Sequence, residues 1–112
     1  MDSSTLNYYQ TCIKNLLSEY GDLNTPETRI EMLFDDYHSH YMVMRIGWYG
    51  QKRIHICLIH ISIEEDEIVI QANNTEDELD NALIACGIPK DKISLGILPP
   101  EIRKAIAQRH AA

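Results

Sequence analysis

Residues 41–63 read YMVMRIGWYGQKRIHICLIHISI, two long runs of strand-forming residues joined by a short turn. This arrangement is typical of a β-hairpin. Apolar side chains occupy alternate positions of the first run and give that strand one apolar face: Met42, Met44, Ile46 and Trp48. The second run is apolar on both faces: Ile54, Ile56 and Leu58 on one, and Cys57, Ile59, Ile61 and Ile63 on the other. Such a strand is either covered on both sides or bulged where the pattern switches.

The rest of the chain supplies partner strands and covering helices for this hairpin. The spacing of apolar residues predicts an amphipathic helix over residues 5–20, with Gly21 at the left-handed position that often ends a helix. Residues 29–37 alternate between apolar and charged side chains, as a half-buried strand does. After the acidic run 64–67, Ile68 begins a fourth strand. Because only short turns link these four strands, we expect an antiparallel meander.

A second helix is expected over residues 75–86. Thr75 and Glu78 have the spacing of a capping box, and Gly87 followed by a proline is typical of a helix end. Residues 93–98 are short and extended, which suits a fifth strand at the edge of the sheet.

The chain after Pro99-Pro100 favours a last, short helix that ends near Arg109 and uses Ile102 and Ile106.

We expect one domain over residues 1–112, since this length is enough for one core and too short for two. The sequence therefore predicts an α+β fold. An antiparallel sheet of about four to five strands packs with the N-terminal helix and with the helix after the fourth strand.

The charge balance bears on which partners the chain can bind. The formal net charge is −7, and the ten basic residues are scattered, with only Lys52-Arg53 and Arg103-Lys104 adjacent. A protein that holds duplex DNA by itself usually carries a basic face, because the neutralisation of phosphates dominates the affinity. We therefore expect little direct binding to nucleic acid.

The three cysteines, Cys12, Cys57 and Cys86, lie far apart in apolar surroundings. Their odd number and their spacing favour reduced, buried thiols over a disulfide framework or a zinc motif. No signal peptide is recognised, and no apolar run approaches the ~20 residues that a membrane span needs. The sequence therefore predicts a cytoplasmic protein without a membrane segment.

Four residues at the tip of the predicted hairpin are candidates for partner binding. Trp48 and Tyr49 lie beside Lys52 and Arg53, within a few positions of the turn. Aromatic and arginine side chains dominate the binding energy of many protein interfaces. The alternative is that Trp48 only caps the hydrophobic core.

Two histidines of the second hairpin strand form a further candidate site. His55 shares a face with Cys57, whereas His60 points to the other face unless a bulge intervenes. These histidines suit proton transfer or metal binding. The alternative is that they are packed residues whose nitrogens are satisfied by their neighbours.

Asp36, His38 and His40 fall at every second position, so an extended chain would place three metal-capable groups on one face. The alternative is a polar turn between two strands, because alternation alone sets no tetrahedral geometry. The sequence shows no nucleophile elbow, phosphate-binding glycine loop or zinc signature. We therefore expect no bound metal and no cofactor.

Short motifs along nearly the whole chain resemble those of one known family. They are Leu16 to Tyr20, Tyr41-Met-Val-Met44, Gly47-Trp48, Lys52-Arg-Ile-His55, Cys57-Leu-Ile-His-Ile61, Ile68 to Gln71, Thr75-Glu76, Gly87-Ile-Pro-Lys-Asp-Lys-Ile93, and Leu95-Gly96 with Pro99-Pro100. In this order and spacing, over residues 6–103, they resemble the XisI family. These are the cyanobacterial excision controlling factors first named for the fdxN DNA element.

The chain departs from the pattern of this family at two places. The family tends to have Asp-Gly in the central turn, where this chain has Tyr49-Gly50. A tyrosine at positive φ costs ~1–2 kcal/mol, so we expect either a turn in which only Gly50 is left-handed or a slightly longer loop. The family also tends to have an acidic residue before the Thr-Glu pair, where this chain has Asn73-Asn74.

The resemblance implies a function in DNA rearrangement. Family members are described as factors that control the site-specific excision of a DNA element, beside a recombinase and a companion protein, XisH, which resembles restriction-type nucleases. The strand over residues 68–71 carries no lysine, which such a nuclease needs near its carboxylates. We therefore interpret the chain as an accessory factor, not an enzyme, that binds an XisH-like nuclease-fold protein. A site-specific recombinase and a second copy of the chain are further candidate partners.

Two alternatives stay open. One is a small metal-dependent or acid–base enzyme that uses His55 and His60 or the row of Asp36, His38 and His40. The other is a weak, direct DNA-binding accessory factor. Elemental analysis tests the first alternative, and a salt-dependent DNA titration tests the second.

Overall fold

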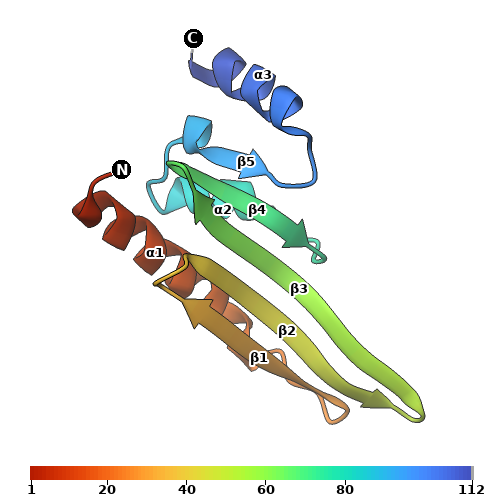
Figure 1. The fold of residues 1–112 in the computed structure, drawn as a ribbon. Coiled ribbons are helices and arrows are strands. Elements are labelled where there is room, and N and C mark those ends of the chain that lie inside the picture. The colour runs from red at the N-terminus through yellow and green to blue at the C-terminus, as the bar shows by residue number, and fades with distance from the viewer. Residues whose placement is uncertain (112) are drawn as a thin grey trace.

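A five-stranded sheet forms the centre of the structure, a computed structural model that describes residues 1–111 (Figure 1). The elements in chain order are α1 (Ser3–Ser18), the 3₁₀ turn η1 (Glu19–Asp22), β1 (Thr28–Asp35), β2 (His40–Tyr49), β3 (Lys52–Glu64), β4 (Glu67–Asn73), α2 (Leu79–Ala85), the 3₁₀ turn η2 (Lys90–Lys92), β5 (Ile93–Leu95) and α3 (Pro100–Ala111). The strands lie in chain order across the sheet, and the first four pair antiparallel. The predicted α+β fold is confirmed.

Two helices, α1 and α2, pack on one face of the sheet, behind it in Figure 1. α1 is capped by Asp2, whose carboxylate accepts a hydrogen bond from the Thr5 N–H at 2.8 Å. The hydrophobic side chains with almost no exposure lie between these helices and the sheet: Ile13, Leu17, Tyr41, Val43, Ile59, Ile61, Ile68, Leu79, Leu83 and Ile88. α1 and α2 leave the other face of β1, β2 and β3 uncovered, and we call it the open face; near the β3–β4 turn, the start of α3 lies across a groove from Glu64 of this face.

The central hairpin agrees with its prediction. β2 and β3 pair up to Tyr49 and Lys52, and Gly50 and Gln51 form a two-residue turn. The turn therefore lies one position later than the predicted Tyr49-Gly50. Gly50 has a φ of +59° and Tyr49 does not adopt a positive φ, so the prediction that only Gly50 is left-handed is confirmed. A glycine at the first central position suits a type II′ turn, whose twist matches that of the strands.

A bulge explains why β3 is apolar on both faces. Val43 pairs with Ile59 but Met44 pairs with Cys57, so Leu58 is an extra residue in β3. Beyond this bulge, the alternation of side chains continues with the opposite parity. The positions of β3 on the helix side are Ile54, Ile56, Ile59, Ile61 and Ile63, and those on the open face are Arg53, His55, Cys57, His60, Ser62 and Glu64.

The expectation of a wholly antiparallel sheet is wrong at one edge. β5 covers only the first part of the predicted strand 93–98, and it pairs parallel with β4. The reason is the connection: α2 carries the chain back along the sheet, and a strand reached by such a crossover runs parallel to the one before it. The predicted last helix is confirmed, and α3 begins at Pro100.

The two glycines expected to end helices behave differently. Gly21 lies inside η1 and has no positive φ, so its predicted left-handed role is wrong. Gly87 ends α2 with a φ of +101°, as predicted. Its N–H donates to Ile84 O at 2.9 Å, and the Ile88 N–H donates to Leu83 O at 3.2 Å. These two hydrogen bonds form a Schellman motif.

The predicted capping box of α2 is also wrong. The Thr75 N–H and hydroxyl both donate to Asn73 Oδ1, at 3.0 and 2.6 Å, and the Thr75 hydroxyl accepts from the Asp77 N–H at 3.2 Å. These local bonds hold the segment in a turn, so α2 begins at Leu79. Asn and Thr side chains compete with helix formation in this way.

The molecule is elongated, with extents of 52 × 29 × 23 Å. The reason is visible in Figure 1, where the tip of the β2–β3 hairpin projects past the end of α1. In the part of the chain that the structure describes, no helix combines the length and the apolar character needed to cross a membrane.

Candidate interaction surface

The tip of the β2–β3 hairpin brings together the four residues predicted to bind a partner. Trp48 and Arg53 are cross-strand neighbours on the open face, and Arg53 Cζ lies 5.3 Å from the centroid of the Trp48 ring. Tyr49 and Lys52 are cross-strand neighbours on the opposite face. Trp48 and Tyr49 are 52% and 53% exposed, so both rings lie outside the core. The cation–π contact orders the indole and the guanidinium before any partner binds.

Gly47 allows the segment before β1 to support the base of this tip. A Cβ atom at Gly47 would lie 2.1 Å from Glu27 O, so only glycine fits there. The Trp48 N–H donates to the same carbonyl oxygen at 3.1 Å. Arg45 Nη1 donates to Thr28 Oγ1 at 2.8 Å. These contacts fix the strands directly below the tip.

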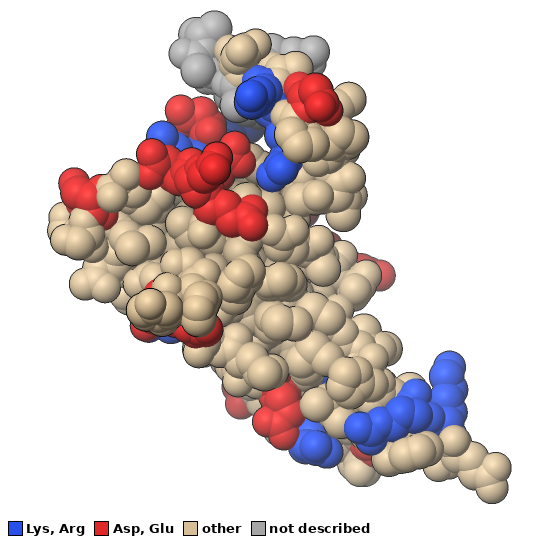
Figure 2. All heavy atoms as spheres, viewed as in Figure 1, with Lys and Arg blue, Asp and Glu red and all other residues tan. Residues whose placement is uncertain are grey.

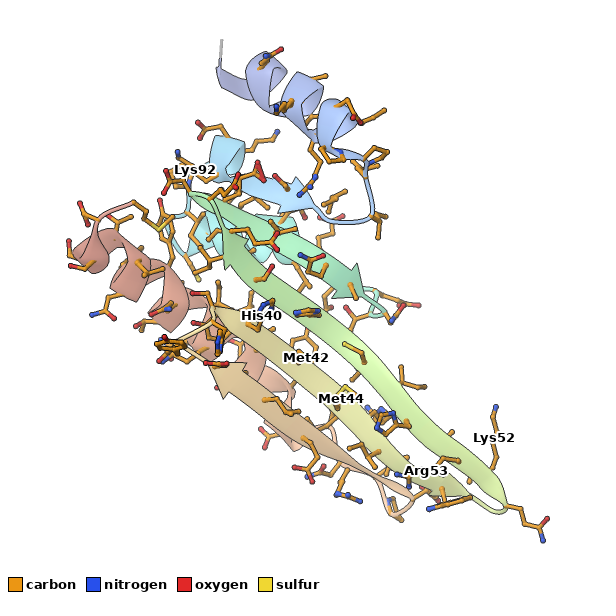
Figure 3. All side chains as sticks on the ribbon, viewed as in Figure 1. His40, Met42, Met44, Lys52, Arg53 and Lys92 are labelled. Atoms are coloured by element: carbon orange, nitrogen blue, oxygen red, sulfur yellow. The ribbon has the colours of Figure 1, made fainter. Side chains whose placement is uncertain are left out.

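Between the tip and the β3–β4 turn, the open face carries mostly apolar or uncharged side chains on β2 and β3, whereas β1 places Arg29, Glu31 and Asp35 on this face. Its apolar members are Leu33, Met42, Met44, Ile46, Trp48 and Cys57. Figure 3 shows Met42 and Met44 in a row along β2, with Lys52 and Arg53 at the far end of the hairpin. Burial raises the pKa of the Cys57 thiol, which therefore stays protonated at neutral pH.

Acidic side chains gather at the opposite end of the open face. Figure 2 shows them around the β3–β4 turn and shows Lys and Arg side chains at the hairpin tip. Glu64 and Glu67 are cross-strand neighbours, and Glu65 and Asp66 form the turn with positive φ. The amino group of Met1 lies 2.5 Å from Asp66 Oδ1, and this hydrogen bond lowers the pKa of Asp66. A groove of about 500 Å³ separates this turn from the start of α3.

His60 has a histidine as its direct partner. His40 Nδ1 and His60 Nε2 lie 3.0 Å apart, so one nitrogen donates and the other accepts. Burial, followed by repulsion from His40, lowers the pKa of His60. His55 shares the open face with His60 because of the bulge, but it is exposed and pairs with Ile46.

The predicted row of Asp36, His38 and His40 is not formed. β1 ends at Asp35 rather than at residue 37, and Ser39 adopts a φ of +57°, so the chain turns where the row required an extended strand. His38 Nδ1 lies 2.6 Å from Asp35 Oδ2. Among the described residues, no group of three His, Cys, Asp or Glu side chains is arranged to hold a metal ion.

Asp36 instead ties α1 to the start of β2. Its carboxylate accepts hydrogen bonds from Lys14 Nζ and from the Tyr41 hydroxyl, each at 2.8 Å. The Lys14 ammonium and then the Tyr41 hydroxyl lower the pKa of Asp36. Burial and the neighbouring carboxylate raise the pKa of Tyr41. These groups act in the packing of the fold.

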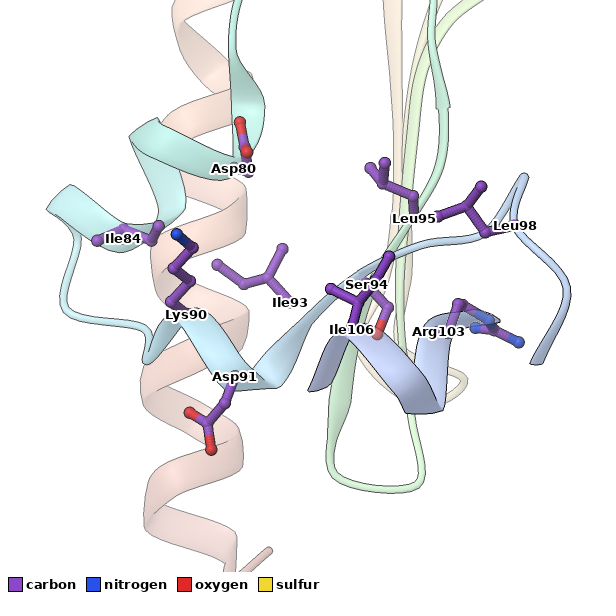
Figure 4. Close-up of a pocket in the computed structure, with 10 residues that line it drawn as sticks. All are labelled: Asp80, Ile84, Lys90, Asp91, Ile93, Ser94, Leu95, Leu98, Arg103 and Ile106. Atoms are coloured by element: carbon purple, nitrogen blue, oxygen red, sulfur yellow. The ribbon is translucent and has the colours of Figure 1, made fainter. Parts of the chain in front are cut away.

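A cavity of about 140 Å³ lies between α2, β5 and α3 (Figure 4). Its lining includes Ile84, Ile93, Leu95 and Ile106, with Lys90 at one side. Pockets that bind small molecules usually span about 300–1,000 Å³. This cavity is therefore a packing gap beneath α3 rather than a candidate substrate site.

The sequence did not indicate two features of this surface. One is the contact between His40 and His60, and the other is that Arg53 and Glu64 lie on the same face of β3. Both depend on the bulge at Leu58. The change in apolar pattern signals that a bulge exists, but no turn residue marks its position.

Comparison with known proteins places the chain in a family. It matches the family model of the XisI protein over residues 1–108. It is similar to the crystal structure of a XisI-like protein from Anabaena variabilis ATCC 29413, with a TM-score of 0.83 and 32% sequence identity over 89% of this chain and 94% of that chain. It is also similar to the fdxN element excision controlling factor XisI from the same organism, with a TM-score of 0.75 and 26% identity over 88% of this chain and 97% of that chain. No match was found among curated proteins. The chain therefore belongs to the XisI family.

Proposed function

We propose that this chain is an accessory factor in the site-specific excision of a DNA element and that it acts by binding a nuclease-like companion of the XisH type. Membership of the XisI family supports the process, as does the similarity to an excision controlling factor. The observation that carries the mode of action is the hairpin tip, where an exposed Trp48 is held against Arg53.

The tip has the chemistry of an interface anchor. Tryptophan, tyrosine and arginine contribute most of the binding energy in many interfaces, because each buries a large surface and still offers a polar group. At this tip the Trp48 ring and the Arg53 guanidinium are already in contact, and Gly47 keeps the strands braced below them. Side chains that are ordered before binding lose less conformational entropy when they enter a pocket.

The negative net charge of the chain suits a partner that itself binds DNA. A protein with a basic DNA-binding surface is attracted to a chain of net charge −7, and such attraction raises the rate of association. In this proposal the nuclease-like companion, rather than this chain, contacts the phosphates. Direct binding of the isolated chain to duplex DNA is therefore expected to be negligible at physiological salt. A tight complex whose affinity falls steeply with salt would favour the DNA-binding alternative.

The proposed action is non-catalytic. Two of the histidines that an acid–base or metal-dependent enzyme would use already contact neighbouring side chains, which supports this part of the proposal. His60 contacts His40, and His38 contacts Asp35. Metal analysis of the purified protein tests this part of the proposal. About one tightly held ion per chain, lost in His55→Ala or His60→Ala, would favour the enzyme instead.

Co-purification with the companion tests the whole proposal. The wild-type chain should retain an XisH-type companion on a column, and Trp48→Ala should not. Tyr37→Ala is the matched control, because Tyr37 is 89% exposed and lies in the β1–β2 turn, at the opposite end of β2 from the tip. Equal retention by folded Trp48→Ala and by wild type would contradict the role of the tip.

A further inference from the structure

We propose that two copies of this chain pair through the open face of β1, β2 and β3, with their hairpins antiparallel. The inference goes beyond the proposed function, since it concerns the chain in the absence of any companion. It depends on the apolar centre of the open face, on the charges at the two ends of that face and on the spacing between those charges.

The open face is apolar along β2 and at Cys57 of β3, where a solvated sheet face is usually polar, and the ion pair of Arg29 and Glu31 on β1 borders this patch. Met42, Met44 and Ile46 occupy successive open-face positions of β2, and Cys57 lies beside Met44 on β3. Leu33, across from Met42 on β1, is 52% exposed. The solvent-facing side of an antiparallel sheet normally alternates polar residues with the buried ones. A contiguous apolar patch on a surface marks an interaction site.

The two ends of this face carry opposite charges. Arg53 lies on the open face at the hairpin tip, and Glu64 lies on the same face at the far end of the same strand. Glu67, the cross-strand neighbour of Glu64, pairs with Arg103 of α3 at 3.9 Å, so Glu64 supplies the negative charge at this end. Figure 2 shows the two charged regions at opposite ends of this face, with a mostly uncharged surface between them that is bordered on one side by further charged side chains. Leu58, the bulged residue, is midway between Arg53 and Glu64 along β3.

This spacing makes the face complementary to itself. A two-fold axis that lies between the two sheets, parallel to them and perpendicular to β3 near Leu58, would place Arg53 of each copy opposite Glu64 of the other. The apolar rows of the two copies would then meet at the centre. A parallel arrangement would bring like charges together and is disfavoured. A dimer with two-fold symmetry uses one patch twice, which is the commonest form of association in soluble proteins.

The size of the face indicates how tightly the copies bind. Three strands about 4.8 Å apart, each about ten residues long at ~3.3 Å per residue, span roughly 500 Å² per copy. The two copies together bury on the order of 1,000 Å², which is at the lower limit for a specific interface. We therefore expect a reversible dimer with a Kd in the micromolar range. Tyr49 and Lys52 point to the other side of the hairpin and stay accessible in this dimer.

Sedimentation equilibrium of the purified full chain, without a companion, tests the dimer. Wild type should shift from monomer to dimer as its concentration rises through the micromolar range. Met44→Lys places a charge at the centre of the face and should weaken dimerisation by at least about tenfold. Tyr37→Lys introduces the same charge at an exposed turn position and should leave dimerisation unchanged. A wild-type monomer at every concentration, or a dimer insensitive to Met44→Lys, would overturn the proposal.

Charge reversal tests the antiparallel alignment. Arg53→Glu and Glu64→Arg should each weaken the dimer about tenfold, because each creates two like-charge contacts across the two-fold axis. The double variant restores opposite charges at both contacts and should recover most of the affinity. Lys52→Glu is the matched control, since Lys52 lies on the opposite face and should have little effect. A double variant weaker than either single one would contradict the alignment. Arg53 also belongs to the tip proposed to bind the companion, so Met44→Lys and Glu64→Arg, which lie outside the tip, separate the two proposals. Both variants should weaken the dimer, and binding of the companion is measured separately in the same variants.

Discussion

Arg53 and Trp48 face each other across the β2–β3 hairpin, with the guanidinium carbon 5.3 Å from the centre of the indole ring. The contact lies at the end of the molecule, outside the core, and exposed cation–π contacts contribute about 0.5–1 kcal/mol. We therefore expect Arg53→Ala to lower the free energy of unfolding by no more than about 1 kcal/mol. Urea denaturation checks this prediction. A loss of several kcal/mol would mean that the tip stabilises the fold and is not held ready for a partner.

Gly47→Ala should destabilise the protein much more than any exchange at the tip. The added Cβ would meet Glu27 O at 2.1 Å and Thr28 Cα at 2.7 Å, and overpacking of this kind costs ~1–3 kcal/mol. Gly21→Ala is the control, because its Cβ would meet only Met32 Cε at an ordinary 3.5 Å. Urea midpoints of the two variants measure the difference. Equal midpoints would show that the segment before β1 does not brace the hairpin.

The hairpin and its partner strands were predictable because alternation with period two is a direct consequence of strand geometry. The position of the bulge could not be predicted, since the extra residue, Leu58, is as apolar as its neighbours. That single residue decides which face His60 and Glu64 occupy. The sequence therefore predicted the candidate residues at the tip but not the arrangement of the open face.

The errors at helix ends have a common physical cause. Thr75 has the spacing of a capping residue, but Asn73 Oδ1 binds its N–H and its hydroxyl first. Local side-chain hydrogen bonds of this kind depend on backbone angles that spacing alone does not determine. The parallel pairing of β5 follows from where α2 leads the chain, which is a tertiary property.

The histidine pair should make stability depend on pH. The pKa of His60 is lowered from its ordinary value of 6.5, so the unfolded state takes up a proton before the folded state does. The contribution of His60 to the free energy of unfolding is therefore fully present above about pH 6.5, and it is lost as the pH falls through and below that value. Denaturant midpoints at about pH 7.5 and about pH 5.5 should differ for wild type. The difference should be smaller in His60→Gln, and an equal difference in both proteins would show that His60 does not cause it.

Tyr49→Asp, which restores the dipeptide typical of the family at this position, should leave the protein folded. Tyr49 is the last residue of β2 rather than a central turn residue, and its ring is 53% exposed. An aspartate there would face Lys52 across the strands, which is a favourable pair. We expect a change in the free energy of unfolding within about 0.5 kcal/mol, measured by circular dichroism during urea denaturation. A large loss would indicate that the Tyr49 ring packs against the fold.

The central claim is that the hairpin tip binds an XisH-type companion, and calorimetric titration of that companion with tip variants tests it most directly. Trp48→Ala and Arg53→Ala should each weaken binding by ~1–3 kcal/mol, the usual contribution of an interface anchor, while circular dichroism shows both variants folded. Lys92→Ala, at the opposite end of the molecule in Figure 3, removes the same charge as Arg53→Ala and should bind like wild type. If folded Arg53→Ala and Trp48→Ala also bind like wild type, the tip is not the binding surface and the proposed mode of action is wrong.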